Sequence, residues 1–298
     1  MRPSLVHTVR WEGTVQQVWD HPAVGTSPDS VASVDSAPTI VMVHGFRGDH
    51  HGLERLVGEL PAHRVLVPDL PGFGQGEELP GTHDVAAYVR FIAECVLRLV
   101  DDPDERVVLL GHSFGSIVAA ETAAAGSTPV DALVLVNPIS APALTGPSRI
   151  ATRAAEAYYL AAARLPERAG LALLSNPAIV RVMSGFMATT ADPSLRRWIH
   201  GQHSAYFSSF ASRRVVLEAF RASISGTVRE RARDLGMPVL LVAAEQDPIG
   251  SIRSQRELAR LIPDATLEII PDVGHLVHYE KPNEAAVLIE RFLETVPA

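Results

Sequence analysis

The chain begins with a stretch in which apolar and polar residues alternate. Residues 5–19 read LVHTVRWEGTVQQVW, with Glu12-Gly13 at the middle. A period of two is typical of strands with one buried face, and a Gly-containing dipeptide between two such runs favours a tight turn. The pattern predicts an antiparallel hairpin. Residues 25–38, GTSPDSVASVDSAP, are rich in Gly, Ser, Pro and Asp and predict a loop.

From residue 39 onward the pattern changes to short, continuous apolar runs, which are typical of parallel strands buried on both faces. The runs are TIVMV (39–43), RVLV (64–67), RVVLL (106–110), ALVLV (132–136), PVLLVAA (238–244) and TLEII (266–270). Segments with helical spacing alternate with them: HGLERLVGEL (51–60), VAAYVRFIAECVLRLV (85–100), FGSIVAAETAAA (114–125), SQRELARLI (254–262) and NEAAVLIERFL (283–293). With the hairpin, this order predicts an α/β fold with a mostly parallel eight-stranded sheet flanked by helices.

The alternation stops at about residue 141 and resumes at about residue 236. The spacing in between is helical and is interrupted by Pro166, Pro177 and Pro193, which predicts several short helices. An insertion after a strand end lies above that end of the sheet. We therefore expect a core domain of residues 1–140 and 236–298 and an inserted, all-helical cap of residues 141–235.

The expected cap is rich in aromatic residues. It holds eight of them: Tyr158, Tyr159, Phe186, Trp198, Tyr206, Phe207, Phe210 and Phe220. Most are expected to form the cap's own core. Phe186, Trp198 and Tyr206 are candidate substrate contacts.

Composition narrows the class of protein. A formal net charge of −8 argues against a nucleic-acid partner, because phosphate binding needs a basic surface. The single lysine, Lys281, lies near the C-terminus in YEKPNE, which disfavours Schiff-base and phosphate-loop chemistry. The single cysteine, Cys95, lies in a helical segment and is expected to be a small buried residue. Neither a signal peptide nor a membrane span is expected, so the protein is predicted to be cytoplasmic. The prediction also includes a small-molecule substrate and no cofactor.

Residues 107–115, VVLLGHSFG, carry the first chemical signal. A serine lies between two glycines, after an apolar run and before an alanine-rich helical segment. In a strand–turn–helix of this kind the glycines allow close backbone packing, and the serine hydroxyl projects over the sheet. The context predicts that Ser113 is a nucleophile.

A serine needs a base to accept its proton, and the base needs a third group to orient it. Both partners are expected at later strand ends. PVLLVAAEQDPIGS supplies Asp247, directly before Pro248, and TLEIIPDVGHLVHYE supplies His275, directly after Gly274. The predicted triad is Ser113, His275 and Asp247.

Other residues compete for these roles. His278 is an alternative base, three residues further along and at the start of an expected helical turn. Asp272 and Glu245 are alternative acids in less suitable positions, Asp69 precedes the serine, and Asn137 occupies another strand end where an acid can stand. Considered alone, Asp247 reads as an ordinary Asp-Pro turn residue.

The loop after the first buried run, VHGFRGDHHG, predicts an oxyanion hole. Gly45 allows close backbone approach, so the Phe46 N–H is a candidate donor together with the Phe114 N–H, which follows the serine. We expect His44 and His112 to hold loops through hydrogen bonds. Asp49 and the His50-His51 pair lack metal-ligand spacing and are expected in a surface loop, so no metal site is predicted.

These motifs resemble the α/β-hydrolase superfamily over nearly the whole chain. The resemblance rests on HGF at 44–46, DLPGFGQG at 69–76, GHSFG at 111–115, QDP at 246–248 and GH at 274–275. It implies an α/β-hydrolase fold with a helical cap, a triad of Ser113, Asp247 and His275, and an oxyanion hole at Phe46 and Phe114. Arg47 departs from the pattern, because many relatives carry an uncharged residue there. We expect a solvated loop arginine, with contact to an anionic substrate group as the alternative.

The leading functional hypothesis is a serine hydrolase, resembling the carboxylesterases, that acts on a small, largely apolar ester or thioester. A serine at the turn argues against haloalkane dehalogenase and epoxide hydrolase chemistry, since such relatives use an aspartate there. The alternatives are a carbon–carbon bond hydrolase or lyase whose carboxylate-bearing substrate binds Arg47, and a ligand-binding receptor on a hydrolase scaffold.

Overall fold

The computed structural model describes residues 2–24, 37–100, 102–144 and 149–297, so the loop expected at 25–38 lies almost wholly outside it. Its centre is one eight-stranded sheet in the order β1-β2-β4-β3-β5-β6-β7-β8. The strands are β1 (Leu5–Trp11), β2 (Thr14–His21), β3 (Thr39–Val43), β4 (Val65–Pro68), β5 (Val107–His112), β6 (Ala132–Val136), β7 (Val239–Ala244) and β8 (Ala265–Ile270). Only the β1–β2 and β2–β4 pairings are antiparallel. This confirms the predicted sheet.

The predicted hairpin is formed by β1 and β2, in which Trp11 pairs with Thr14. The two residues between them, Glu12 and Gly13, have φ of 47° and 78°. Two positive φ angles give the turn a twist that matches the twist of the strands, and glycine adopts this conformation without strain.

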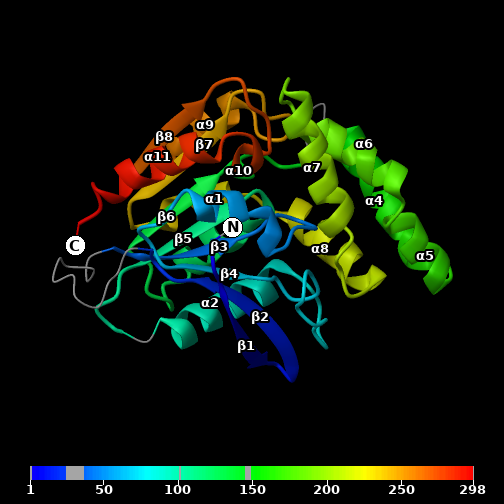
Figure 1. Cartoon of the computed structure of the whole chain (residues 1–298), viewed down its shortest axis with the longest axis horizontal. Coiled ribbons are helices and arrows are strands. Elements are labelled where there is room, and N and C mark those ends of the chain that lie inside the picture. Colours follow the sequence, from blue (N-terminus) through cyan, green and yellow to red (C-terminus); the bar gives the residue numbers. More distant parts are fainter. Residues whose placement is uncertain (1, 25–36, 101, 145–148, 298) are drawn as a thin grey trace.

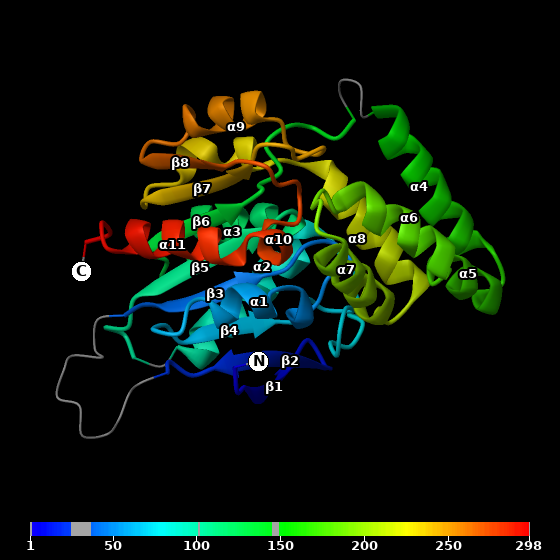
Figure 2. The same ribbon diagram turned by 45° about the horizontal axis from the view of Figure 1, so that its top comes forward.

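Helices cover both faces of the sheet (Figures 1 and 2). One face packs against α1 (Glu54–Gly58), α10 (Val277–Glu280) and α11 (Pro282–Leu293), and the other against α2 (Val85–Leu99), α3 (Phe114–Ala124) and α9 (Ile252–Ala259). Neighbouring residues of one strand serve different faces. In β3, Ile40 and Met42 pack on the α1 side, whereas Val41 and Val43 pack on the α2 side. This two-sided burial explains why the runs are continuously apolar.

One strand differs from its prediction. β8 was expected to be buried on both faces, but only Ile270 among its residues is fully buried. The reason is its place at the edge of the sheet, where one side of the strand has no neighbour. Cys95 is buried in α2 as expected, and burial raises the pKa of its thiol.

Five helices follow β6 before the sheet resumes. They are α4 (Arg149–Arg164), α5 (Glu167–Leu174), α6 (Pro177–Met187), α7 (Pro193–Tyr206) and α8 (Arg213–Ser225). Two short 3₁₀ turns, η3 (Val228–Glu230) and η4 (Ala232–Asp234), follow α8 before β7, and another, η2 (His50–Gly52), precedes α1. Pro177 and Pro193 are the first residues of α6 and α7, where proline is well tolerated. These helices lie at one end of the sheet (Figure 2). We call α4 to α8 the cap helices.

By length and composition alone, Glu167–Met187 is apolar enough to cross a membrane, with a mean hydropathy of 1.2. In the structure this stretch is two helices, α5 and α6, with a break before Pro177. Such a stretch is weak evidence for a membrane span.

Candidate active site

Ser113 stands at a sharp turn between β5 and α3. Its backbone has φ 54° and ψ −120°, a conformation that costs a non-glycine residue about 1–3 kcal/mol. The glycines on either side are needed for packing. A Cβ on Gly111 would collide with the carbonyl of Gly115, and one on Gly115 with the carbonyl of Val43. The turn thereby holds the serine hydroxyl above the end of the sheet.

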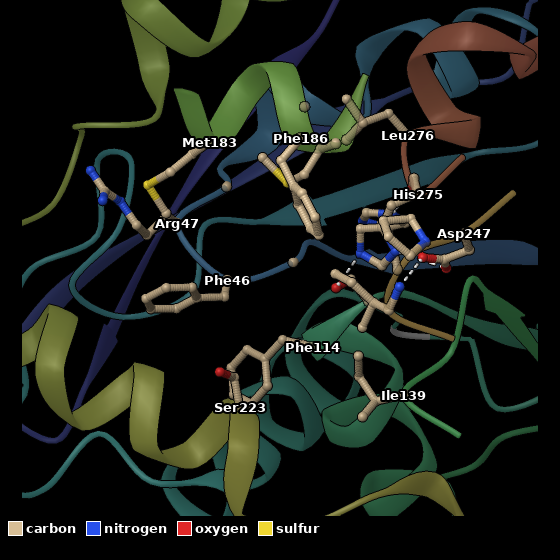
Figure 3. A pocket seen from close by; sticks show the side chains of 18 of the residues that line it. Phe46, Arg47, Phe114, Ile139, Met183, Phe186, Ser223, Asp247, His275 and Leu276 are labelled. Atoms are coloured by element: carbon tan, nitrogen blue, oxygen red, sulfur yellow. Dashed lines mark hydrogen bonds and ion pairs between the residues drawn. The ribbon is translucent and has the colours of Figure 1, made fainter. Parts of the chain in front are cut away.

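The structure brings Ser113, His275 and Asp247 into one chain of hydrogen bonds. The Ser113 Oγ lies 2.8 Å from His275 Nε2, and His275 Nδ1 lies 2.9 Å from Asp247 Oδ2. Figure 3 shows His275 beside Asp247 at one side of a cavity. Because a carboxylate only accepts hydrogen bonds, Nδ1 carries the proton and Nε2 accepts from the serine.

Electrostatics keep the Asp247 carboxyl ionised. Burial by itself would raise its pKa, but the His275 ring and the N–H groups of Ile249 and Gly250 outweigh burial and lower it. The Ile249 N–H donates to Asp247 Oδ1 at 2.8 Å. The acid is thus charged and oriented before substrate arrives.

Asn137, directly after β6, joins the loops of this site. Its Nδ2 donates to the carbonyls of Gly274 at 3.2 Å and His275 at 2.8 Å, and its Oδ1 accepts from the Ala244 N–H at 2.8 Å. The sequence suggested Asn137 only as a position for an acid. Asn137 links these loops through backbone groups, which the sequence does not mark. The one indication in the sequence is that a polar residue ends a wholly apolar strand.

The competing residues do not join the triad. The His278 ring lies 4.0 Å from the His112 ring, and burial, with His112 next, lowers the His278 pKa well below its ordinary value. Asp272 and Glu245 are exposed, and Glu245 accepts from the Asp272 N–H at 3.2 Å. No hydrogen bond of the described residues connects any of the three with His275.

Phe46 and Phe114, whose N–H groups are the predicted oxyanion donors, lie close to Ser113. Both residues border the cavity next to Ser113, and a Cβ on Gly45 would lie 3.3 Å from the Ser113 Cβ. Phe114 is the first residue of α3, so its N–H has no acceptor within the helix. Within the described part of the chain, neither N–H donates to a protein acceptor. The helix N-terminus also favours negative charge at this point.

His44 and His112 hold loops, as expected. His44 Nδ1 donates to the Gly45 carbonyl and its Nε2 accepts from the Leu70 N–H, both at 2.9 Å. His112 Nε2 donates to the His275 carbonyl at 3.1 Å, and burial lowers the His112 pKa to about 3. Both rings are therefore parts of the scaffold.

The expectation of a surface loop at His50 and His51 is wrong. His50 is buried because its Nδ1 and N–H donate to the Asp69 carboxylate at 2.9 Å and 2.8 Å. His51 is partly buried, and its ring stacks on Tyr206 of α7 at 3.7 Å. Asp49, His50 and His51 could approach one metal ion among the described residues. However, Nδ1 of each histidine is already bonded to a carboxylate.

A cavity of about 1030 Å³ lies between the strand ends and the cap helices, and Ser113 and His275 open into it. Its lining is mainly apolar (Figure 3). The apolar residues include Phe46, Phe114, Ile139, Ala151, Ala155, Val182, Met183, Phe186, Met187, Phe207, Phe220 and Ile224. A large, mainly apolar cavity with a few convergent polar groups is typical of a site for a small apolar ligand.

The structure places two of the three aromatic candidates for substrate contact at the cavity and the third away from it. Phe186 and Tyr206 line the cavity. Trp198 is not among the lining residues; its ring lies 5.3 Å from the ring of Tyr279 and against the Arg55 guanidinium. Trp198 is thus corrected from a substrate contact to a packing residue.

Arg47 also differs from its prediction. It is 1% exposed instead of solvated. Its guanidinium donates to backbone carbonyls of the cap, which removes it from the expected surface. The sequence does not reveal this role, because every residue carries a main-chain carbonyl and no pattern of residue types marks such an acceptor.

Comparison with known proteins agrees with this fold. Residues 40–287 match the model of the alpha/beta hydrolase family. The chain belongs to that family, and its sheet and helices have the α/β-hydrolase fold.

Relatives of this chain differ in function. An uncharacterized protein from Mycobacterium tuberculosis is 27% identical over 268 residues, covering 87% of this chain and 76% of the relative. Epoxide hydrolase A from the same organism is 23% identical over 300 residues, covering 88% and 92%. The structure of a thermophilic esterase from Thermogutta terrifontis superposes with a TM-score of 0.75 at 22% identity, covering 100% of both chains. Such distant similarity shows the shared fold and leaves the substrate to the site.

Proposed function

We propose that this protein is a serine hydrolase that cleaves an apolar carboxylic ester or thioester through an acyl-enzyme intermediate. The observation that carries the proposal is the hydrogen-bonded chain from Ser113 through His275 to Asp247, at 2.8 Å and 2.9 Å. The positive φ of Ser113 supports it, since backbone strain of this kind is kept where it serves function.

In the proposed mechanism each group has one step. His275 Nε2 takes the hydroxyl proton as Ser113 Oγ attacks the carbonyl carbon, and the Asp247 carboxylate stabilises the imidazolium that forms. The Phe46 and Phe114 N–H groups donate to the oxyanion. His275 then gives its proton to the departing alcohol or thiol. Water, activated by the same imidazole, finally hydrolyses the acyl-enzyme and restores the serine.

The cavity supports an apolar substrate of considerable size. At about 1030 Å³ it is at the upper end of the usual range for ligand sites, roughly 300–1,000 Å³. The expected restriction to small esters is therefore not part of the proposal. Among the lining residues Arg47 is the only arginine, and none is a lysine. Because Arg47 is bonded to the cap, nothing in the site favours the carboxylate-dependent carbon–carbon cleavage considered from the sequence.

A labelling and turnover experiment tests the proposal. The purified protein is treated with a fluorophosphonate probe and assayed on p-nitrophenyl esters of increasing acyl length. We expect labelling and turnover by the wild type, and loss of both in Ser113→Ala. Ser116→Ala is the matched control, because Ser116 lies on the same helix with its hydroxyl bonded to the Ser113 carbonyl.

Two results would contradict the proposal. One is ester turnover that persists in Ser113→Ala. The other is a wild type that is neither labelled nor active on esters and thioesters, but that cleaves a β-diketone or no substrate at all.

A further inference from the structure

Arg47 is a buried arginine whose guanidinium has no carboxylate partner among the described residues. Its Nε donates to the Phe207 carbonyl at 3.0 Å and its Nη2 to the Leu174 carbonyl at 2.9 Å. The guanidinium carbon lies 4.4 Å from the centre of the Phe207 ring and 5.3 Å from that of Phe210. Removing an arginine from water is costly unless its charge is compensated.

The two carbonyls are ends of cap helices. Leu174 is the last residue of α5, and Phe207 directly follows α7 as its C-terminal cap. Carbonyls at a helix C-terminus lack an intrahelical donor and carry the negative end of the helix dipole. Arg47 is thus a shared cap for two helix C-termini, and they compensate its charge in place of a carboxylate.

The backbone of Arg47 belongs to the predicted oxyanion hole. Residues 45–48 form a tight turn closed by a bond from the Gly48 N–H to the Gly45 carbonyl at 3.0 Å. Arg47 has φ 59° in this turn, a conformation usually reserved for glycine. The protein keeps this strained backbone at Arg47, whose side chain reaches the cap helices. Phe46, the preceding residue, also packs on the cap, with its ring 5.6 Å from Tyr159 and 5.7 Å from Phe220.

The guanidinium is not placed to bind substrate. Figure 3 shows it on the other side of the cavity from His275 and Asp247 and turned away from them. Two of its three nitrogens donate to backbone carbonyls, and the third, Nη1, is inaccessible to solvent and without a hydrogen-bond partner. A role in holding the turn explains these contacts, whereas binding of a substrate carboxylate does not.

We propose that Arg47 is a positioning residue that couples the cap to the oxyanion hole. By holding the ends of α5 and α7, its side chain fixes the 45–48 turn so that the Phe46 N–H points at the reacting carbonyl. The inference rests on the proposed function, because it takes the Phe46 N–H as an oxyanion donor. It adds that the cap contributes to the chemical step as well as to substrate selection.

Substitutions at two arginines test the coupling. Arg47→Ala and Arg47→Gly both remove the side chain, and glycine also relieves the left-handed backbone, so a loss shared by both comes from the side chain. Arg213→Ala is the matched control. Arg213 donates to the carbonyls of Ala162, Ala163 and Leu165 at the end of α4, wholly within the cap. Arg47→Lys keeps the charge but replaces the planar fork of donors with one ammonium nitrogen, which cannot reproduce the geometry of both bonds.

The readouts are kcat and KM for a p-nitrophenyl ester, and the affinity for an aryl trifluoromethyl ketone. The ketone forms a tetrahedral adduct with the serine and places an oxyanion in the hole. In Arg47→Ala and Arg47→Gly we expect kcat to fall about 10–100-fold and ketone affinity to fall in parallel, with KM changed less than about threefold. Arg47→Lys should be intermediate, added guanidinium at low millimolar concentration should partly restore Arg47→Gly, and Arg213→Ala should stay near wild type.

Three results would overturn the inference. One is a kcat near that of the wild type in both side-chain deletions. Another is a fall in kcat without loss of ketone affinity. The third is an equal loss in Arg213→Ala, which would reduce Arg47 to a contributor to cap stability. Failure of the proposed function is separate, because the wild type would then show no turnover that depends on Ser113.

Discussion

The sheet and the cap helices are held together by different kinds of contact. Strands β3 to β7 are buried over their whole lengths and consist almost entirely of apolar residues. By contrast, the sixteen residues of α4 bury only Tyr159 and Ala162, and α6 buries only Val180 and Ser184. Polar bonds supplement this small core. Ser184 Oγ lies 2.6 Å from His200 Nδ1 and 2.7 Å from His203 Nδ1, which joins α6 to α7.

This difference separates the two tasks of the site. The proposed reacting groups lie on loops of a sheet that cannot move without breaking a dense core, so their geometry is preorganised. The roof of the cavity consists of helices with few buried residues, whose side chains can be exchanged with little loss of stability. We therefore expect changes in the sheet to abolish activity or folding, and changes in the cap helices to alter substrate preference.

The most severe change to the sheet side is Asp247→Asn. An amide carries no negative charge to stabilise the His275 imidazolium, and its N–H₂ group favours the wrong tautomer of the ring, so kcat should fall about 10⁴-fold. Steady-state turnover of a p-nitrophenyl ester measures the effect. Asp272→Asn is the control, because Asp272 is exposed and has a φ of 50° that asparagine tolerates. An Asp247→Asn enzyme with a tenth of the wild-type kcat would contradict the assignment.

Alanine substitutions at two glycines, one packed against the sheet and one in the cap helices, compare how tightly the two regions are packed. Gly115→Ala places a Cβ against the main-chain carbonyls of Val43 and His44, which cannot yield, and should cost roughly 3 kcal/mol or more. Gly185→Ala on α6 meets no atom within 4 Å and should stabilise the helix by about 0.5–1 kcal/mol. Urea unfolding measures both changes. Equal effects would mean that the regions do not differ in packing.

The cap should also lose stability in acid. Burial lowers the pKa of His203 to about 4 from the ordinary 6.5, so between these values the unfolded chain binds a proton that the folded chain does not. The stabilisation is therefore complete above about pH 6.5, and it falls toward pH 4 by at most about 1.4 kcal/mol per pH unit. His203→Gln removes this titration and should flatten the dependence of the unfolding midpoint on pH. If the unfolding midpoint of the variant depended on pH as strongly as that of the wild type, protonation of His203 would not be the cause of the acid destabilisation.

The mildest change tests the roof of the cavity. Phe186 is 65% exposed and points into the cavity (Figure 3). Phe186→Ala should lower kcat/KM for a long-chain ester about tenfold while leaving an acetyl ester nearly unchanged, since only the long chain reaches the ring. Trp198→Ala removes an aromatic residue from α7 away from the cavity and should preserve the preference for acyl length. A uniform loss on all esters in Phe186→Ala would place its effect on the reacting groups instead.

The same contrast explains how much of the molecule could be predicted from the sequence. Burial on both faces leaves continuous apolar runs, so β3 to β7 were assigned both their place and their burial, whereas β8, an edge strand with a run of the same kind, was assigned the wrong burial. Ser113, Asp247 and His275 could be found because strand ends in a parallel sheet meet at one edge.

Prediction failed where the partner of a side chain is main chain or depends on packing between helices. Arg47 and Asn137 bond to backbone carbonyls, which every residue carries, so no pattern of residue types marks the contact. Trp198 has the same helical spacing as Gln202 and Tyr206, which line the cavity, but it lies about one turn nearer the start of α7, beside Tyr279. His50 is buried by Asp69, which lies on a different loop.

The pairing of β6 with β7 has a consequence for the synthesis of the chain. Leu133 pairs with Val239, and all five cap helices lie between these two residues along the chain. The ribosome therefore completes β6 long before its neighbour exists, and ALVLV stands as an unpaired apolar edge while the cap is translated. Closing the sheet across so long a separation is slow. The insertion that roofs the cavity thus also creates the interval in which the nascent chain most needs protection from aggregation.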